Sequence, residues 1–206
     1  MLKAQLCAVF DDIGVDAVKI GMLHAPDIVR TVAWALKNYK VQRVVLDPVM
    51  VAKSGDALLA GAAVGALREA LVPLALVITP NLPEAGVLLE SRAPESVKEM
   101  TRAAERLHRL MGSGERWVWL KGGHLPGGDA TDLLFNGDRM IEISRPRVET
   151  KNTHGTGCTL SAALAALLPQ RPDVPAAAQD AKDYLTEALR QADALQIGQG
   201  HGPVHH

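Results

Sequence analysis

The sequence has few of the residues that mark several common classes of protein. Only two of its 206 residues are cysteine, Cys7 and Cys158, so no disulfide framework underlies the fold. Aromatic residues make up 3% and the formal net charge is -1, which offers no basic surface to nucleic acid. No apolar run is long enough to cross a bilayer, and the N-terminus lacks the pattern of a signal peptide. We therefore expect a cytoplasmic protein without nucleic-acid or membrane partners.

Two common nucleotide-binding signatures are also missing. Gly155-Thr-Gly157 is followed by Leu160 where a dinucleotide fingerprint needs its third glycine. The segment Ala52-Lys53-Ser54 lacks the glycine frame of a P-loop. These absences disfavour a nicotinamide dehydrogenase and a P-loop enzyme.

Short β-branched runs alternate with longer alanine-rich segments in which apolar residues recur every three and four positions. This alternation predicts one α/β domain over residues 1–206, with a mostly parallel sheet covered by helices on both faces. The predicted strands are Ala17–Ile20, Arg43–Leu46, Leu76–Thr79 and Trp117–Leu120. The predicted helices are Asp27–Asn38, Ala57–Leu71, Ser96–Met111, Thr159–Leu168 and Ala176–Ala192.

Two further segments have a distinct pattern. Asp132–Phe135 and Met140–Ile143 flank the turn Asn136-Gly-Asp138, which predicts an antiparallel hairpin at one end of the sheet. At the N-terminus, apolar residues recur with helical spacing from Leu2 to Ile13, but no N-cap residue precedes them. That start is typical of a helix entered midway, although an ordinary amphipathic N-terminal helix fits the pattern equally well.

The segment Lys151-Asn-Thr-His-Gly-Thr-Gly-Cys-Thr-Leu-Ser161 predicts an anion-binding turn at a helix N-terminus. Gly155 and Gly157 allow a tight turn whose N–H groups point in one direction, with Thr156 between them. Cys158 would lie in the first helical turn, where the helix dipole favours a thiolate. The alternative is a glycine-rich turn with a small packed residue.

Polar residues follow the predicted strands, and ligands of open parallel sheets bind at the carboxyl ends of the strands. Asp47 and Glu84 supply oxygen ligands that suit magnesium, directly or through water. Lys121 suits a contact with phosphate. Asn81 would either hydrogen-bond the water shell of the metal or cap the following helix, and capping is slightly favoured. Met22 is more often a core residue than a ligand contact. Each of the three charged residues also has a purely structural interpretation. Asp47 would then only start a turn, Glu84 would only complement the dipole of the helix that follows, and Lys121 would be a solvated lysine at a strand end.

Four motifs together resemble one family. They are Asp47-Pro-Val-Met-Val-Ala-Lys-Ser-Gly-Asp56, Thr79-Pro-Asn-Leu-Pro-Glu-Ala85, Lys121-Gly-Gly-His124 and Asn152-Thr-His-Gly-Thr-Gly-Cys-Thr159. They are similar to the hydroxymethylpyrimidine/phosphomethylpyrimidine kinases of thiamine biosynthesis, which are ribokinase-like. The resemblance extends to the final His201-Gly-Pro-Val-His-His206, and a cysteine in the glycine loop, where many ribokinase relatives carry aspartate, is its most diagnostic feature.

The resemblance implies ATP-dependent phosphorylation of 4-amino-5-hydroxymethyl-2-methylpyrimidine and then of its monophosphate. It implies that the backbone from Gly155 to Cys158 holds the transferred group and that Cys158 is the base. It also implies roles for five other side chains: ATP phosphate contact by Lys121, a place beside the nucleotide for Thr153, magnesium binding by Asp47 and Glu84, and pyrimidine contact by Met22.

The sequence also departs from that family. Relatives begin with a strand and a glycine-rich segment, followed by residues that cover the pyrimidine, and no such segment precedes the helix at Leu2. We therefore expect a ribokinase-like fold whose N-terminal strand and lid are missing. The exposed sheet edge predicts either poor stability or self-association into a homo-oligomer. A pyridoxal- or pyridoxine-type kinase and a catalytically inert nucleotide-binding remnant remain as alternatives.

Overall fold

A computed structural model of the chain describes residues 1–50, 61–123 and 125–206. At its centre lies a six-stranded sheet whose strand order follows the sequence. The strands are β1 (Val18–Ile20), β2 (Val44–Leu46), β3 (Val77–Ile78), β4 (Trp117–Leu120), β5 (Asp129–Phe135) and β6 (Met140–Pro146). The first four are parallel, and β5 and β6 form an antiparallel hairpin beside β4. Both the parallel sheet and the terminal hairpin confirm the prediction.

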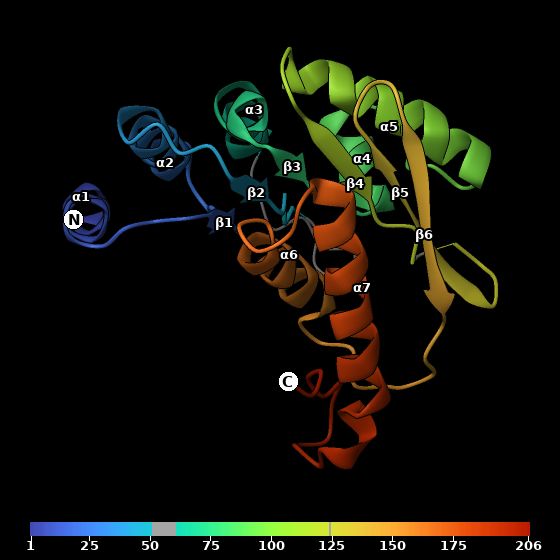
Figure 1. The fold of residues 1–206 in the computed structure, drawn as a ribbon. Coiled ribbons are helices and arrows are strands. Elements are labelled where there is room, and N and C mark those ends of the chain that lie inside the picture. Colours follow the sequence, from blue (N-terminus) through green and yellow to red (C-terminus); the bar gives the residue numbers. More distant parts are fainter. Residues whose placement is uncertain (51–60, 124) are drawn as a thin grey trace.

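Helices connect and cover these strands (Figure 1). They are α1 (Leu2–Asp12), α2 (Pro26–Asn38), α3 (Gly61–Ala70), α4 (Leu82–Leu88), α5 (Val97–Met111), α6 (Thr156–Leu167) and α7 (Val174–Arg190), with short 3-10 turns η1 (Val72–Leu74) and η2 (Ala192–Ala194). The predicted helices lie close to these bounds, apart from the start of the predicted helix at Ala57, which falls outside the described residues. Helix α7 begins earlier than predicted because Asp173 caps it, accepting a 2.8 Å hydrogen bond from the Ala176 amide.

The sheet separates two apolar layers, because successive strand residues point to opposite faces. Leu46, Ile78 and Leu120 belong to the core that includes residues of α2, α3 and α5. Their strand neighbours, such as Val45 and Trp119, belong to the core that includes residues of α6 and α7. Figure 1 shows α6 and α7 on one side of the sheet and α2, α3 and α5 on the other. This arrangement confirms the prediction of helices on both faces.

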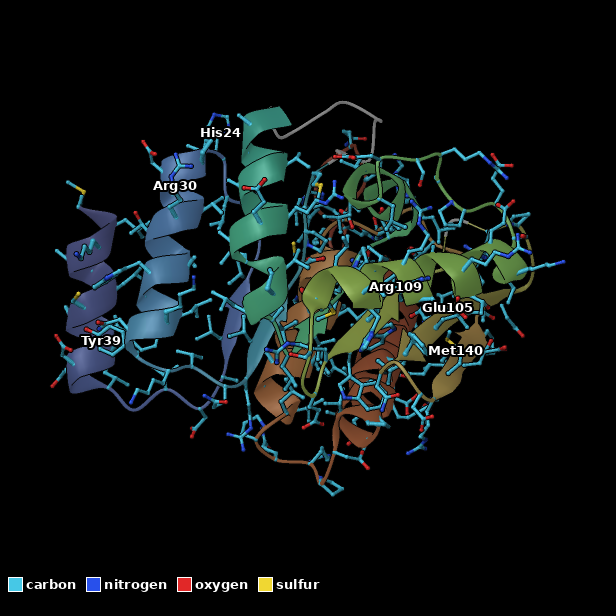
Figure 2. The ribbon with its side chains drawn as sticks, turned by 90° about the horizontal axis from the view of Figure 1, so that it is seen from above. His24, Arg30, Tyr39, Glu105, Arg109 and Met140 are labelled. Carbon is cyan, nitrogen blue, oxygen red and sulfur yellow. The ribbon has the colours of Figure 1, made fainter. Side chains whose placement is uncertain are left out.

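Helix α1 lies at the outer side of α2 and has no buried residue (Figure 2). It contacts α2 through side chains at its two ends. The Phe10 ring stacks on Tyr39 with 4.6 Å between centroids, and the Tyr39 hydroxyl donates a 2.7 Å hydrogen bond to Asp11. The Lys3 amine lies 3.9 Å from the centre of the Trp34 ring. As the sequence predicts, no side chain caps the start of α1.

In the part of the chain that the structure describes, no helix has the length and apolar character needed to cross a membrane.

Candidate active site

Asp47 follows β2 at the carboxyl edge of the sheet and is only 1% exposed. One oxygen, Oδ1, accepts hydrogen bonds from Lys121 Nζ at 3.0 Å and from Thr79 Oγ1 at 3.1 Å. The other, Oδ2, accepts a 3.2 Å hydrogen bond from Ser161 Oγ on α6. A buried carboxylate needs such partners, because burial without them is costly. Asp47 therefore joins β2 to the ends of β3 and β4 and to the first turns of α6.

Glu84 and Asn81 form a capping box at the start of α4. The Glu84 amide donates to Asn81 Oδ1 at 2.8 Å, and the Asn81 amide donates to Glu84 Oε2 at 2.7 Å. Of the two roles expected for Asn81, the structure shows the cap. Burial raises the pKa of Glu84 to about 7, against the opposing influence of the Lys121 charge and of the Asn81 amide, while Asp47 adds to the rise.

Lys121 directly follows β4; its amine is paired with Asp47 and is electrostatically linked to Glu84. Its backbone amide donates to Pro80 O at 2.9 Å, and it forms a parallel bridge with Asn81, which brings the ends of β3 and β4 together. Burial lowers the pKa of its amine, but Asp47 and Glu84 raise it more, and the net pKa is raised. The amine is therefore a positive charge held at the carboxyl edge.

The predicted anion-binding turn forms the start of α6. Gly155 is its N-cap with φ of 86°, a left-handed conformation that glycine adopts without strain. Thr156, Gly157 and Cys158 are the first three helical residues, and Cys158 is an exposed free thiol. A Cβ placed on Gly157 would lie 3.4 Å from Lys121 Nζ. The first turn of α6 therefore lies beside the lysine, so that backbone N–H groups and an amine can act on one anion.

The loop before α6 is held by the last residues of the chain. Asn152 is 4% exposed, and its amide nitrogen donates to Ala192 O at 3.0 Å. Its Oδ1 accepts a 3.1 Å hydrogen bond from the Gly202 amide. His154 pairs with Pro203 in an isolated bridge. The C-terminal residues therefore support the loop that leads into the anion-binding turn.

The remaining predicted residues are less closely tied to this cluster. The Thr153 amide donates to Lys151 O at 3.1 Å within the loop before α6. Met22 follows β1 and is 52% exposed, so it is not a core residue. The motif residues Lys53, Ser54, Asp56 and His124 lie outside the described residues.

Thr79 and Ser161 also hold Asp47, although no sequence pattern predicted a role for either residue. Their signal was weak: Thr79 ends an apolar strand, and Ser161 interrupts an alanine-rich helix. Ser161 is fully buried and also donates to Gly157 O at 3.0 Å, so it ties Asp47 to the anion-binding turn.

The fold and this edge define a class of protein. A mostly parallel sheet with helices on both faces, a lysine paired with a buried carboxylate and a glycine-led helix start are the features of a ribokinase-like small-molecule kinase. The chain matches the family described as phosphomethylpyrimidine kinase over residues 1–205. It belongs to that family.

Curated relatives agree with this assignment. The hydroxymethylpyrimidine/phosphomethylpyrimidine kinase of Escherichia coli is 50% identical over 205 residues, which cover 100% of this chain and 76% of the relative. The enzyme of the same name from Rhizobium meliloti is also 50% identical, over 206 residues that cover 100% of this chain and 76% of that relative.

Solved structures show the same fold. An ADP complex of Bacillus subtilis pyridoxal kinase superposes with a TM-score of 0.91 and 38% identity, covering 100% of this chain and 75% of that one. Phosphomethylpyrimidine kinase from Clostridium difficile superposes with a TM-score of 0.77 and 38% identity, covering 91% of this chain and 75% of that one. Both confirm the ribokinase-like fold predicted from the sequence.

Proposed function

We propose that this chain transfers the γ-phosphoryl group of ATP to the hydroxymethyl group of 4-amino-5-hydroxymethyl-2-methylpyrimidine, and then phosphorylates the monophosphate. The relatives from Escherichia coli and Rhizobium meliloti bear the name of this activity. The observation that carries the proposal is the approach of Lys121 to the first turn of α6, 3.4 Å from the Cβ position of Gly157. Phosphoryl transfer depends mainly on positioning and charge neutralisation, and these groups supply both.

In this proposal the backbone from Gly155 to Cys158 holds the transferred phosphoryl group, because its N–H groups face outward from the helix start. Lys121 binds ATP phosphate oxygens and neutralises their charge. Cys158 takes the proton of the substrate hydroxyl, since its thiol is exposed at the third position of α6.

Magnesium fits the same edge. Asp47 and Glu84 offer the oxygen donors that this ion prefers, and both are electrostatically linked to Lys121. Among the described residues there is no group of three or more side chains that could hold a metal. The two carboxylates would therefore bind the ion together with water and phosphate oxygens, as is usual for magnesium. Bound there, the ion would supply charge neutralisation at the phosphates.

Three further residues complete the proposed site. Thr153 lies in the loop before α6 and would adjoin the nucleotide. Asn81 would contribute to nucleotide binding indirectly, by holding the start of α4, which it caps. Met22, which follows β1 and is 52% exposed, would contact the pyrimidine ring.

Pyridoxal is the second candidate substrate. The TM-score of 0.91 to Bacillus subtilis pyridoxal kinase favours it, because that structure shares the whole of the present fold. The residues that hold phosphate would serve either alcohol, so the substrate must be decided by assay.

The test is MgATP-dependent phosphorylation of each alcohol by the purified chain, read by product chromatography. We expect turnover of hydroxymethylpyrimidine that exceeds turnover of pyridoxal. Replacement of Cys158 by alanine should lower kcat by about 10²-fold or more, the usual contribution of a general base, and leave the KM for ATP within about twofold. Cys7→Ala is the matched control, because Cys7 is the other free cysteine and lies on α1.

Each outcome decides between the candidates. Unchanged turnover of Cys158→Ala would remove Cys158 as the base. Faster turnover of pyridoxal would replace the proposed substrate by the second candidate. ATP binding by a folded sample without turnover of either alcohol would contradict the proposed kinase activity and support an inert nucleotide-binding protein.

A further inference from the structure

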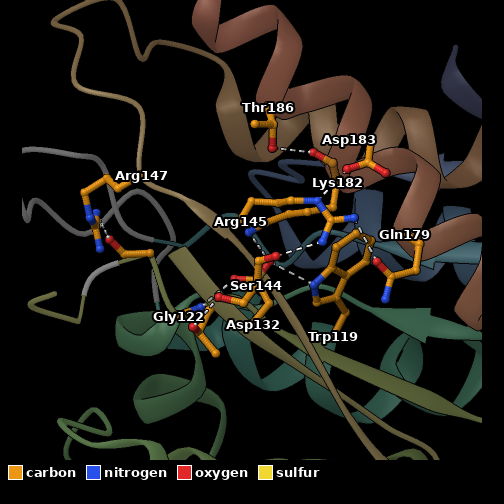
Figure 3. A network of polar contacts seen from close by, with 12 residues as sticks. Trp119, Gly122, Asp132, Ser144, Arg145, Arg147, Gln179, Lys182, Asp183 and Thr186 are labelled. Carbon is orange, nitrogen blue, oxygen red and sulfur yellow. Dashed lines mark hydrogen bonds and ion pairs between the residues drawn. The ribbon is translucent and has the colours of Figure 1, made fainter. Parts of the chain in front are cut away.

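Asp132 on β5 is a buried carboxylate with three donors (Figure 3). Its Oδ2 accepts hydrogen bonds from Lys182 Nζ at 2.7 Å and from Trp119 Nε1 at 3.1 Å. Its Oδ1 accepts a 2.9 Å hydrogen bond from the backbone amide of Gly122. Gly122 directly follows Lys121, the lysine of the proposed phosphate site. The carboxylate therefore holds the peptide next to that lysine.

Lys182 is the counter-ion of this carboxylate. It lies on α7 and is 6% exposed, so that both charges are withdrawn from water. Replacing a buried ion pair by apolar residues of similar volume is often neutral or stabilising, so such a pair is weak support for stability alone. The hydrogen bonds of this pair do, however, fix the orientation of its groups. Lys182 orients the Asp132 carboxylate, and the carboxylate orients the Gly122 amide.

The backbone at Gly122 is also fixed by close packing. A Cβ at this position would overlap the carbonyl oxygen of Thr131 and lie 2.9 Å from Met100 Cε. The turn after β4 thus lies directly against β5. Further along the same turn, the Arg147 guanidinium donates to Gly123 O at 2.8 Å and to Leu125 O at 2.9 Å. These contacts therefore restrain the backbone that follows β4, while the side chain of Lys121 is directed towards Asp47.

We propose that Asp132, with Lys182 as its counter-ion, is a positioning residue that acts through the Gly122 amide to hold the Lys121 amine between Asp47 and the start of α6. The consequence for ATP rests on the proposed function, in which Lys121 binds phosphate. The geometric part, restraint of the turn after β4, is independent of that function.

The first test compares the KM for ATP, which does not depend on the fraction of folded enzyme. Asp132→Asn keeps an oxygen for the Gly122 amide but leaves Lys182 without a counter-charge, and Lys182→Met leaves the carboxylate uncompensated. We expect each to raise the KM for ATP about tenfold, which corresponds to about 1.4 kcal/mol. The matched control is Asp183→Asn. Asp183 follows Lys182 on α7, and the change removes its partly exposed ion pair with Arg145 on β6, which should leave the KM within about twofold.

A double-mutant cycle with Lys121→Ala tests the route of the effect. If Asp132 acts through Lys121, Asp132→Asn should raise the KM by less than about twofold in the Lys121→Ala background. A further tenfold rise in that background would overturn the proposal. So would single variants that lower the melting temperature while the KM for ATP stays unchanged, because that is the signature of a purely structural pair.

Hydrogen exchange separates the failure of this inference from failure of the proposed function. In Asp132→Asn and Lys182→Met we expect the amides of residues 121–123 to exchange at least fivefold faster, with no change in Asp183→Asn. If the wild-type chain binds no ATP, the proposed function is contradicted. Amide hydrogen exchange alone would then show whether Asp132 restrains the turn after β4. Unchanged exchange would overturn the inference even if ATP is bound and turned over.

Discussion

The buried carboxylate of Glu84 should make the stability of this protein depend on pH. Its pKa is raised from 4.5 to about 7, chiefly by burial, and it is 3% exposed. At about 1.4 kcal/mol per unit, this rise corresponds to a contribution of about 3 kcal/mol. In the folded state Glu84 keeps its proton above the pH at which the unfolded chain releases it. The contribution is therefore fully present below about pH 4.5 and is lost as pH rises through about 7.

The perturbation that isolates this effect is Glu84→Gln. Glutamine retains an oxygen for the Asn81 amide, which donates to Glu84 at 2.7 Å, so the capping box can persist while the titrating group is removed. We expect the free energy of unfolding of the variant minus that of the wild type to increase by up to about 3 kcal/mol between pH 4.5 and 8. Other titrating groups largely cancel in this difference.

The assay is urea unfolding followed by circular dichroism at half-unit steps of pH, without nucleotide or magnesium. A difference that stays constant from pH 4.5 to 8 would refute the raised pKa of Glu84. Repeating the series with MgATP tests the proposed metal role, because a cation beside the carboxylate should lower its pKa and move the transition to lower pH.

Two substitutions at helix starts test the local structure of the site. Asn81→Ala removes the oxygen that accepts a hydrogen bond from the Glu84 amide. It should lower the free energy of unfolding, measured by urea unfolding, by about 1 kcal/mol. A change below about 0.3 kcal/mol would contradict the importance of the cap. Gly155→Ala places a side chain at φ of 86° and should lower the free energy of unfolding by about 1 to 2 kcal/mol, with weaker ATP binding in an equilibrium titration. Gly61→Ala is its control, because Gly61 lies in open space at the start of α3. Equal effects of the two substitutions would argue against strain at Gly155.

Much of this fold could be predicted because its signals are local. The apolar run Trp117–Leu120 has the bounds of β4, and the hairpin follows from its Asn-Gly turn. The hairpin strands extend beyond the predicted apolar segments, because β-sheet pairing continues through polar residues such as Asp129 and Thr131, which carry no apolar signal.

The candidate site was partly predictable for a geometric reason. Parallel strands bring their carboxyl ends to one edge, so residues that follow different strands, such as Asp47 and Lys121, meet there. The partners that hold these groups could not be found in this way. Ser161 is 114 positions from Asp47, and Lys182 is 50 positions from Asp132, and no local pattern specifies such pairs.

The pairing of the C-terminal residues with the loop before α6 has a consequence for the order of folding. Asn152 and Gly202 are 50 positions apart, and Val204 is buried in the core beside α6 and α7. Contacts of such separation form only after the later segment is available. During synthesis the sheet can assemble with Asp47 and Lys121 in place while the loop at Asn152 still lacks its partner. A ribosome that stalls before residue 202 would therefore present a formed sheet edge while the loop before α6 lacks its C-terminal support.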